Sequence, residues 1–178
     1  MSSYMKIRDD FDKKCNKKTS CDSKKDIDCG KVEKPGKPML LFCGNGVDAE
    51  FTSANSPAVN VGFVTVDTTC LCKPLVKIKF SSIVNLTGLA ALPNAILNFR
   101  LFRVCENSES LLLNTWVYQA SLISDNAVPL TFNTSFTFNF CDRLSCPRCC
   151  DYYVEASVST LANATVGVSA VQVQAITQ

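Results

Sequence analysis

The densest group of reactive side chains lies in the stretch FCDRLSCPRCCDYY, which runs from Phe140 to Tyr153. Thiols at this density support three kinds of chemistry: disulfide formation, zinc binding and thiol–disulfide exchange. An alternating aromatic run precedes the stretch and a β-like run follows it, so we expect a corner between two strands. The stretch holds four of the eleven cysteines of the chain, namely Cys141, Cys146, Cys149 and Cys150.

The spacing of these thiols leaves several interpretations open. Cys146 and Cys149 form a C-x-x-C motif, and Cys70 and Cys72 could complete a four-thiolate zinc site. The chain contains no His, so a zinc site would need thiolates alone. Redox catalysis would need a helix N-terminus in a βαβ setting, which the surrounding pattern does not resemble. The sequence favours disulfides, with zinc as the alternative and buried free thiols as the remaining interpretation.

The composition argues against an enzyme, a nucleic-acid-binding protein and a membrane protein. Without His the chain lacks the usual general base and the commonest metal ligand. No stretch approaches the roughly 18 to 20 apolar residues of a membrane helix, and the N-terminus has no apolar signal-peptide core. No cofactor is predicted. The carboxylates that could be paired for acid–base work are expected at solvated strand ends: Glu106, Asp142, Asp151 and Glu155.

Residues 1–37 differ from the rest of the chain and predict an extended arm. They carry eleven Lys or Arg and seven Asp or Glu, with few large apolar side chains, so they cannot bury enough surface to fold alone. Acidic residues interleave the lysines, which argues against nucleic-acid binding. Three thiols in such a segment indicate that it bonds to something, and these are Cys15, Cys21 and Cys29.

Residues 38–178 predict a second unit made of β-strands. Short runs with a period of two, rich in Val, Ile, Phe and Thr, alternate with Gly, Asn, Asp, Ser and Pro. The first run ends at the expected turn Gly44-Asn45-Gly46. We expect eight strands, at about 39–43, 58–66, 75–86, 95–105, 112–122, 132–140, 152–159 and 164–176.

The alternation also predicts which side chains are buried. In the third strand the buried set is Val76, Ile78, Phe80, Val84 and Leu86, with Lys77 and Lys79 in water. The second strand should bury Val59, Val61 and Phe63 before its parity slips, and the eighth should contain a bulge between its two valine pairs. The fourth strand should bury Leu97, Phe99 and Leu101. The fifth and sixth strands should each present one apolar face, made of Leu112, Trp116, Tyr118, Ala120 and Leu122 and of Phe132, Phe136, Phe138 and Phe140.

Eight antiparallel strands in about 140 residues predict a jelly-roll β-sandwich, with an immunoglobulin-like sandwich as the rival. Jelly-roll order places the fourth strand beside the seventh, so Cys105 comes near Cys149 or Cys150. It also places the third strand beside the sixth, which brings Cys70 or Cys72 towards Cys141. Neighbouring strands lie about 4.8 Å apart, within reach of a disulfide. Seven cysteines therefore gather at one end, while Cys43 is expected at the opposite pole.

Several segments carry a likeness to a known family. The segments LLFCGNG, TVDTTCLCKPLVKIKFSS, NFRLFRVCENSES and FCDRLSCPRCCDYYVEAS resemble a clostridial family of small cysteine-rich β proteins. In layout the chain is similar to the endospore appendage subunits of bacilli. That likeness implies a jelly roll that polymerises into stiff fibres, with an N-terminal connector whose cysteines form disulfides to neighbouring subunits.

The resemblance implies that Cys15, Cys21 and Cys29 are the connector thiols, and that the receiving thiols are among Cys43, Cys70, Cys72, Cys105, Cys141, Cys146, Cys149 and Cys150. We therefore expect a self-assembling structural subunit of an extracellular, spore-borne fibre, without a classical signal peptide. Its expected partners are copies of itself in a helical polymer, with other spore-surface proteins as further candidates. A head-to-tail contact that does not close makes such a filament. The alternative is a monomeric or small-oligomer zinc module that uses Cys70, Cys72, Cys146 and Cys149.

Overall fold

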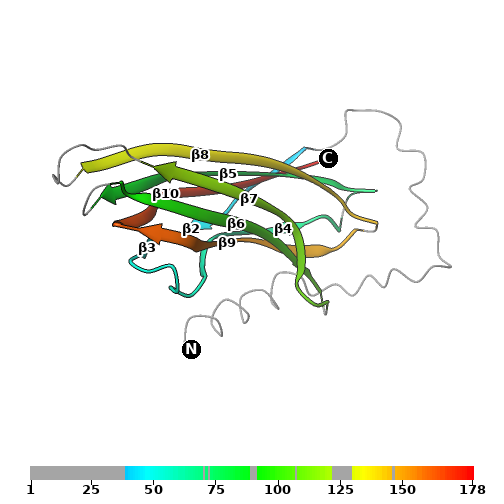
Figure 1. Cartoon of the computed structure of the whole chain (residues 1–178). Coiled ribbons are helices and arrows are strands. Elements are labelled where there is room, and N and C mark those ends of the chain that lie inside the picture. Colours follow the sequence, from blue (N-terminus) through cyan, green and yellow to red (C-terminus); the bar gives the residue numbers. More distant parts are fainter. Residues whose placement is uncertain are drawn as a thin grey trace.

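In a computed structural model, the described part of the chain is a β-sandwich of two antiparallel sheets (Figure 1). The described residues are 39–69, 71, 73–88, 92–106, 108–121, 130–145 and 147–178. Every regular element among them is a strand, so none of them forms a helix long and apolar enough to cross a membrane. The predicted arm lies outside the described residues, and so do six of the cysteines: Cys15, Cys21, Cys29, Cys70, Cys72 and Cys146.

Each sheet contains five strands. The first, called here the β10 sheet, has the order β1-β10-β5-β8, with β3 also paired to β10, and the second, the β9 sheet, has the order β2-β4-β9-β6-β7. The β10 sheet comprises β1 (Leu40–Cys43), β3 (Ala49–Phe51), β5 (Leu75–Gly88), β8 (Leu130–Arg143) and β10 (Ala164–Thr177). The β9 sheet comprises β2 (Asn45–Gly46), β4 (Val59–Asp67), β6 (Asn94–Cys105), β7 (Leu111–Ser121) and β9 (Cys149–Ala162).

This strand order confirms the predicted jelly roll. The third and sixth predicted strands are β5 and β8, which pair along their whole length, and the fourth and seventh are β6 and β9, which also pair. The eight predicted runs all form strands. The structure has ten, because the segment after the first run adds β2 and β3.

The expected turn at Gly44-Asn45-Gly46 is instead the place where the chain changes sheets. Asn45 and Gly46 pair with β4 in the β9 sheet, after which β3 returns to β10. The backbones approach so closely here that a Cβ at Gly44 would lie 2.2 Å from the carbonyl oxygen of Phe63, and one at Gly46 would lie 2.2 Å from that of Val171. Only glycine fits at this crossing.

The crossing also corrects the placement of Cys43. The chain continues past this residue along the same edge as far as Phe51, so Cys43 is not at the opposite pole. It faces Gln174, three residues along β10 from the pair Leu40 and Thr177 at the end of the sheet. The prediction was wrong because periodicity alone cannot separate a strand that ends from one that crosses to the other sheet.

The core between the sheets follows the predicted alternation most closely in β5. Its five predicted apolar side chains are all buried, and Lys77 and Lys79 are exposed. The predicted set of β6 is buried as well. An aromatic cluster fills the side of the sandwich between β7 and β8, where Trp116 stacks on Phe138 with ring centroids 3.7 Å apart. Because these strands belong to different sheets, the stack joins the two layers.

Bulges account for most of the differences in side-chain direction. The predicted bulge in β10 is confirmed, between Ser169 and Gln172. In β4 the slip lies earlier than expected, between Asn60 and Gly62, so Phe63 points outwards and is only half buried. In β7 the register shifts, which leaves Leu112 48% exposed and turns Leu113 towards the core. In β8, Phe132 is 45% exposed, while Leu122 lies outside the described residues.

Candidate cross-linking cysteines at one end of the sandwich

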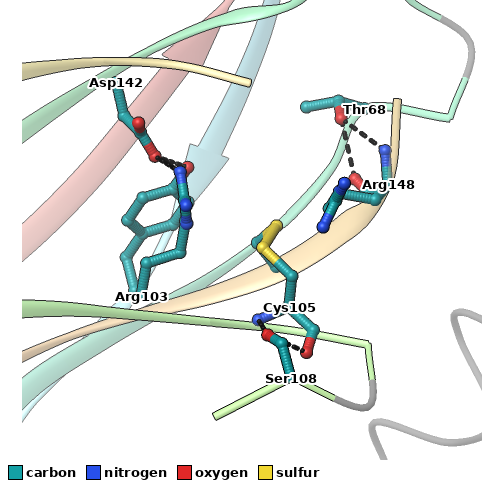
Figure 2. Close-up of a disulfide and its surroundings, with 8 residues drawn as sticks. Thr68, Arg103, Cys105, Ser108, Asp142 and Arg148 are labelled. Atoms are coloured by element: carbon teal, nitrogen blue, oxygen red, sulfur yellow. Dashed lines mark hydrogen bonds and ion pairs between the residues drawn. A yellow bond between two sulfur atoms is a disulfide. The ribbon is translucent and has the colours of Figure 1, made fainter. Parts of the chain in front are cut away.

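One disulfide joins the central strands of the β9 sheet. Cys105 ends β6 and faces Cys150 at the start of β9, and their sulfur atoms are bonded (Figure 2). The sequence had left Cys149 and Cys150 open as partners. The two bonded residues are 3% and 0% exposed. Cys149 is disulfide-bonded as well. These sulfurs are therefore oxidised and buried, so they belong to the framework of the domain.

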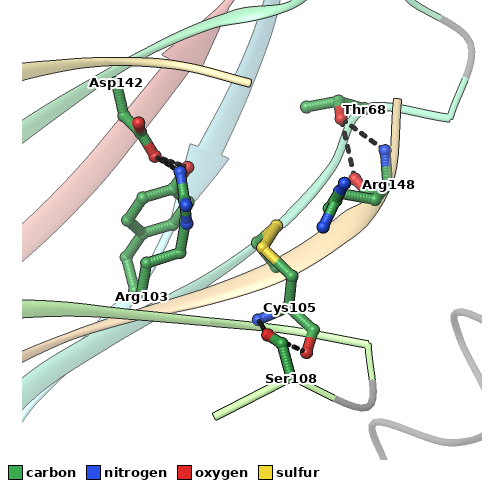
Figure 3. Close-up of polar contacts among 8 residues, drawn as sticks. Thr68, Arg103, Cys105, Ser108, Asp142 and Arg148 are labelled. Atoms are coloured by element: carbon green, nitrogen blue, oxygen red, sulfur yellow. Dashed lines mark hydrogen bonds and ion pairs between the residues drawn. A yellow bond between two sulfur atoms is a disulfide. The ribbon is translucent and has the colours of Figure 1, made fainter. Parts of the chain in front are cut away.

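Backbone and hydroxyl contacts hold the loops around this disulfide (Figure 3). The Thr68 hydroxyl donates to the Arg148 carbonyl oxygen at 2.7 Å and accepts from the Arg148 amide at 3.0 Å. The Ser108 hydroxyl donates to the Cys105 carbonyl oxygen at 2.8 Å and accepts from the Cys105 amide at 3.1 Å. Both contacts fix a loop against the disulfide-bonded strands, since each uses two hydrogen bonds in opposite directions.

An ion pair joins the two sheets near the same end. The Arg103 guanidinium on β6 donates to Asp142 Oδ2 on β8 at 2.7 Å, and the Tyr152 hydroxyl on β9 donates to the same oxygen at 2.8 Å. Burial, and then the neighbouring carboxylate, raise the pKa of Tyr152 well above its usual range, so it remains a donor. Asp142 is only 8% exposed, which corrects the expectation of a solvated strand-end residue.

Sequence reasoning missed this network, although the signal was present. Asp142 continues the inward parity of Phe136, Phe138 and Phe140 on β8, so its side chain had to enter the space between the sheets. A carboxylate placed there needs a cationic partner, which Arg103 supplies from the facing sheet.

Two described cysteines remain unpaired, and both are exposed. Cys141 faces Lys77 across the β8–β5 pair, and Cys43 faces Gln174 across the β1–β10 pair. Lys77 in turn faces Ile176 on β10, and Ile176 faces Leu41 on β1, two residues before Cys43. Because side chains two residues apart share a face of a sheet, both thiols lie on the solvent face of the β10 sheet.

The other predicted thiol sites are only partly testable. Cys70, Cys72 and Cys146 lie outside the described residues. Within the described part of the chain, no group of three or more His, Cys, Asp or Glu could hold a metal ion. Zinc ligation needs a thiolate, and the disulfide-bonded Cys149 does not offer one in this state.

The fold and these thiols define a class: jelly-roll β-sandwich proteins with a disulfide between neighbouring strands at one end. The chain belongs to the family described as "Domain of unknown function (DUF4489)", whose model matches residues 37–177. No curated protein matches the chain.

Similar solved structures have low sequence identity. A structure of infectious bursal disease virus Gx strain is 10% identical, with a TM-score of 0.40, over 79% of this chain and 32% of that one. Eiger TNF from S. frugiperda is 13% identical, with a TM-score of 0.33, over 74% of this chain and 92% of that one. The CBM22-1 xylan-binding domain from Paenibacillus barcinonensis Xyn10C is 14% identical, with a TM-score of 0.30, over 74% and 83%.

Proposed function

We propose that this protein is a structural subunit that self-assembles into an extracellular fibre, borne on endospores, in which arm cysteines form disulfides with neighbouring subunits. The main support for the proposal is that the described cysteines fall into an oxidised group and an unpaired group. Cys105, Cys149 and Cys150 are oxidised, whereas Cys43 and Cys141 are unpaired, exposed and on one face. Among the described cysteines, Cys43 and Cys141 are therefore the acceptors that are accessible to Cys15, Cys21 and Cys29 of another copy.

The outer strands support self-assembly independently. Within the described part of the chain, no strand pairs with the outer edge of β7 in the β9 sheet or of β8 in the β10 sheet. β7 contains no charged residue or proline, and β8 is charged only at Asp142 and Arg143. Charges, prolines and bulges are the usual devices that keep edge strands from pairing with another chain. Long edges of 11 and 14 residues with so few of these devices favour contact between copies.

The spore-borne location rests on the resemblance in sequence and layout. A producing cell that lyses after sporulation would release its subunits and expose their thiols to oxidation. The proposal assigns no enzymatic role.

The test is negative-stain electron microscopy paired with non-reducing and reducing gels. The full chain should give filaments and a ladder of bands that collapses on reduction. Two variants should lose the ladder: Cys43→Ser with Cys141→Ser, and the arm variant with Ser at Cys15, Cys21 and Cys29. Asn139→Ser is a matched control, because Asn139 is exposed on the same face two residues from Cys141.

Each result has a distinct meaning. A single monomer band and no filaments from the full chain would refute the fibre. A ladder that survives in the Cys43 and Cys141 variant would move the acceptor role to other thiols. Native mass spectrometry that finds bound zinc without intermolecular disulfides would favour the zinc module instead.

A further inference from the structure

The solvent face of the β10 sheet carries opposite charges at its two ends. At the end that bears Cys141, the exposed charged side chains are Lys77, Lys79 and Arg143. Lys77 lies directly opposite Cys141, Lys79 lies one alternation further along β5, and Arg143 lies two residues beyond Cys141 on β8. The neighbouring Asp142 points inwards and is paired with Arg103, so it does not neutralise this face.

The other end of the same face is acidic and hollowed. A groove there is lined by Asp48 and Glu50 together with uncharged polar side chains of β5 and β10, among them Asn85 and Thr165. Glu50 faces Gly167 on β10, which in turn faces Asn85 on β5. None of the described residues that line the groove is Lys or Arg.

The distance between the basic end and the acidic end of this face follows from the number of β5 residues that separate them. Asn85 lies eight residues after Lys77 on β5, which corresponds to about 27 Å at the rise of an antiparallel strand. A segment that binds along this face should therefore carry negative charge and positive charge about 27 Å apart.

The arm has this charge pattern around its first and last thiols. Cys15 lies in the sequence DKKCNKK, between two pairs of lysines, and Cys29 lies in DIDCGK, where Asp26 and Asp28 before it outnumber Lys31 after it. Cys21 has two lysines, Lys18 and Lys24, and one aspartate, Asp22, within three residues. The fourteen residues from Cys15 to Cys29 can span up to about 46 Å, so they cover 27 Å without being fully extended.

We infer that the β10 solvent face is the docking surface for the arm of a second copy, with the acidic Cys29 segment at the Cys141 end and the basic Cys15 segment in the groove of Asp48 and Glu50. The inference rests on the proposed function and adds the pairing: Cys29 bonds to Cys141. The two thiols lose two protons and two electrons, and a small-molecule disulfide accepts them and becomes two thiols.

The length of the arm also allows a bond between Cys29 and Cys141 of the same chain, and the experiment must distinguish this bond from one between two chains. Cys29 is ten residues from Met39, a reach of about 33 Å, whereas β1 and β8 are three strand spacings apart, about 14 Å. Cys29 could therefore reach Cys141 of its own chain as well as that of a second copy.

The experiment mixes two isotopically distinct populations of the full chain, reduces them and reoxidises them with oxidised glutathione at low ionic strength. Disulfides are then mapped by mass spectrometry of proteolytic fragments. We expect Cys29–Cys141 cross-links between light and heavy chains. Lys77→Glu with Lys79→Glu should slow their formation about tenfold, and adding Asp26→Lys with Asp28→Lys in the arm should restore the rate. High salt should remove the difference.

The outcomes distinguish this inference from the proposed function. Cys29–Cys141 links confined to one chain would support the pairing and overturn assembly through it. Links between chains that join Cys141 to Cys15 or Cys21 would overturn the inference and leave the fibre standing. An absence of links from any arm cysteine would overturn both. A rate that the lysine reversals leave unchanged would overturn the electrostatic docking.

Discussion

Removal of the Cys105–Cys150 disulfide should destabilise the sandwich by about 4 kcal/mol. The bond joins residues 45 apart, and loop-closure entropy for a loop of that length gives about 4 kcal/mol at 25 °C. We expect Cys105→Ala with Cys150→Ala to lose this amount, with a fall of about 10 °C in Tm. Both side chains are buried, so a small packing loss adds to the entropic effect.

The assay is guanidinium unfolding followed by tryptophan fluorescence. The chain has a single Trp, Trp116, which stacks on Phe138 of the facing sheet, so its emission reports separation of the two sheets. The measurement should be made with Ser at Cys15, Cys21 and Cys29, because intermolecular bonds would otherwise contribute to stability.

The matched control is Cys43→Ala with Cys141→Ala in the same background. These two cysteines are exposed and unpaired, so their replacement should change the free energy of unfolding by less than about 0.5 kcal/mol. A loss below about 1 kcal/mol in the Cys105 and Cys150 variant, or an equal loss in the control, would refute the stabilisation expected from this disulfide.

Three further predictions follow from the same end of the molecule. Asp142→Ala should cost about 3 to 5 kcal/mol of unfolding free energy, because it leaves the Arg103 guanidinium without its partner between the sheets. Burial raises the pKa of the Asp151 carboxyl above its usual value of 3.8, and a hydrogen bond from the Thr65 hydroxyl offsets this only partly. As pH rises, the carboxyl therefore loses its proton in the unfolded chain before it does in the folded protein, and the free energy of unfolding falls between the two pKa values. The stability gained by Asp151→Asn should therefore grow as pH rises above about 4 and then level off. In the native protein, maleimide should label Cys43 and Cys141 rapidly, and the disulfide-bonded cysteines only after reduction and unfolding.

For each of these three predictions, one experimental result would contradict it. An Asp142→Ala variant as stable as the parent would show that the ion pair contributes nothing net. A stability difference for Asp151→Asn that shrinks with rising pH would reverse the sign of the burial effect. Slow labelling of Cys43 or Cys141 would mean that the thiol is covered or oxidised in solution.

The strand content and much of the burial could be predicted from the sequence. In β5 and β8 an alternation of apolar and polar side chains persists over many residues, and only a half-buried strand satisfies it. The strand order then followed from packing two such sheets face to face, whereas the expected count of eight fell short of the ten strands present. The same order brought Cys105 within reach of β9, because partners in neighbouring strands lie about 4.8 Å apart.

What the sequence could not determine were features that depend on where a neighbouring strand lies. Gly44 and Gly46 resemble an ordinary turn, and only the close approach of Phe63 and Val171 makes them a crossing between sheets. The choice of Cys150 over its neighbour Cys149 depends on the register of β9 against β6, which a slip of one residue would reverse. Cys43 and Cys141 share a solvent face only once β1, β10, β5 and β8 lie side by side, and the same holds for the opposite charges at the two ends of that face. Tertiary pairing is needed because these residues are far apart in the chain.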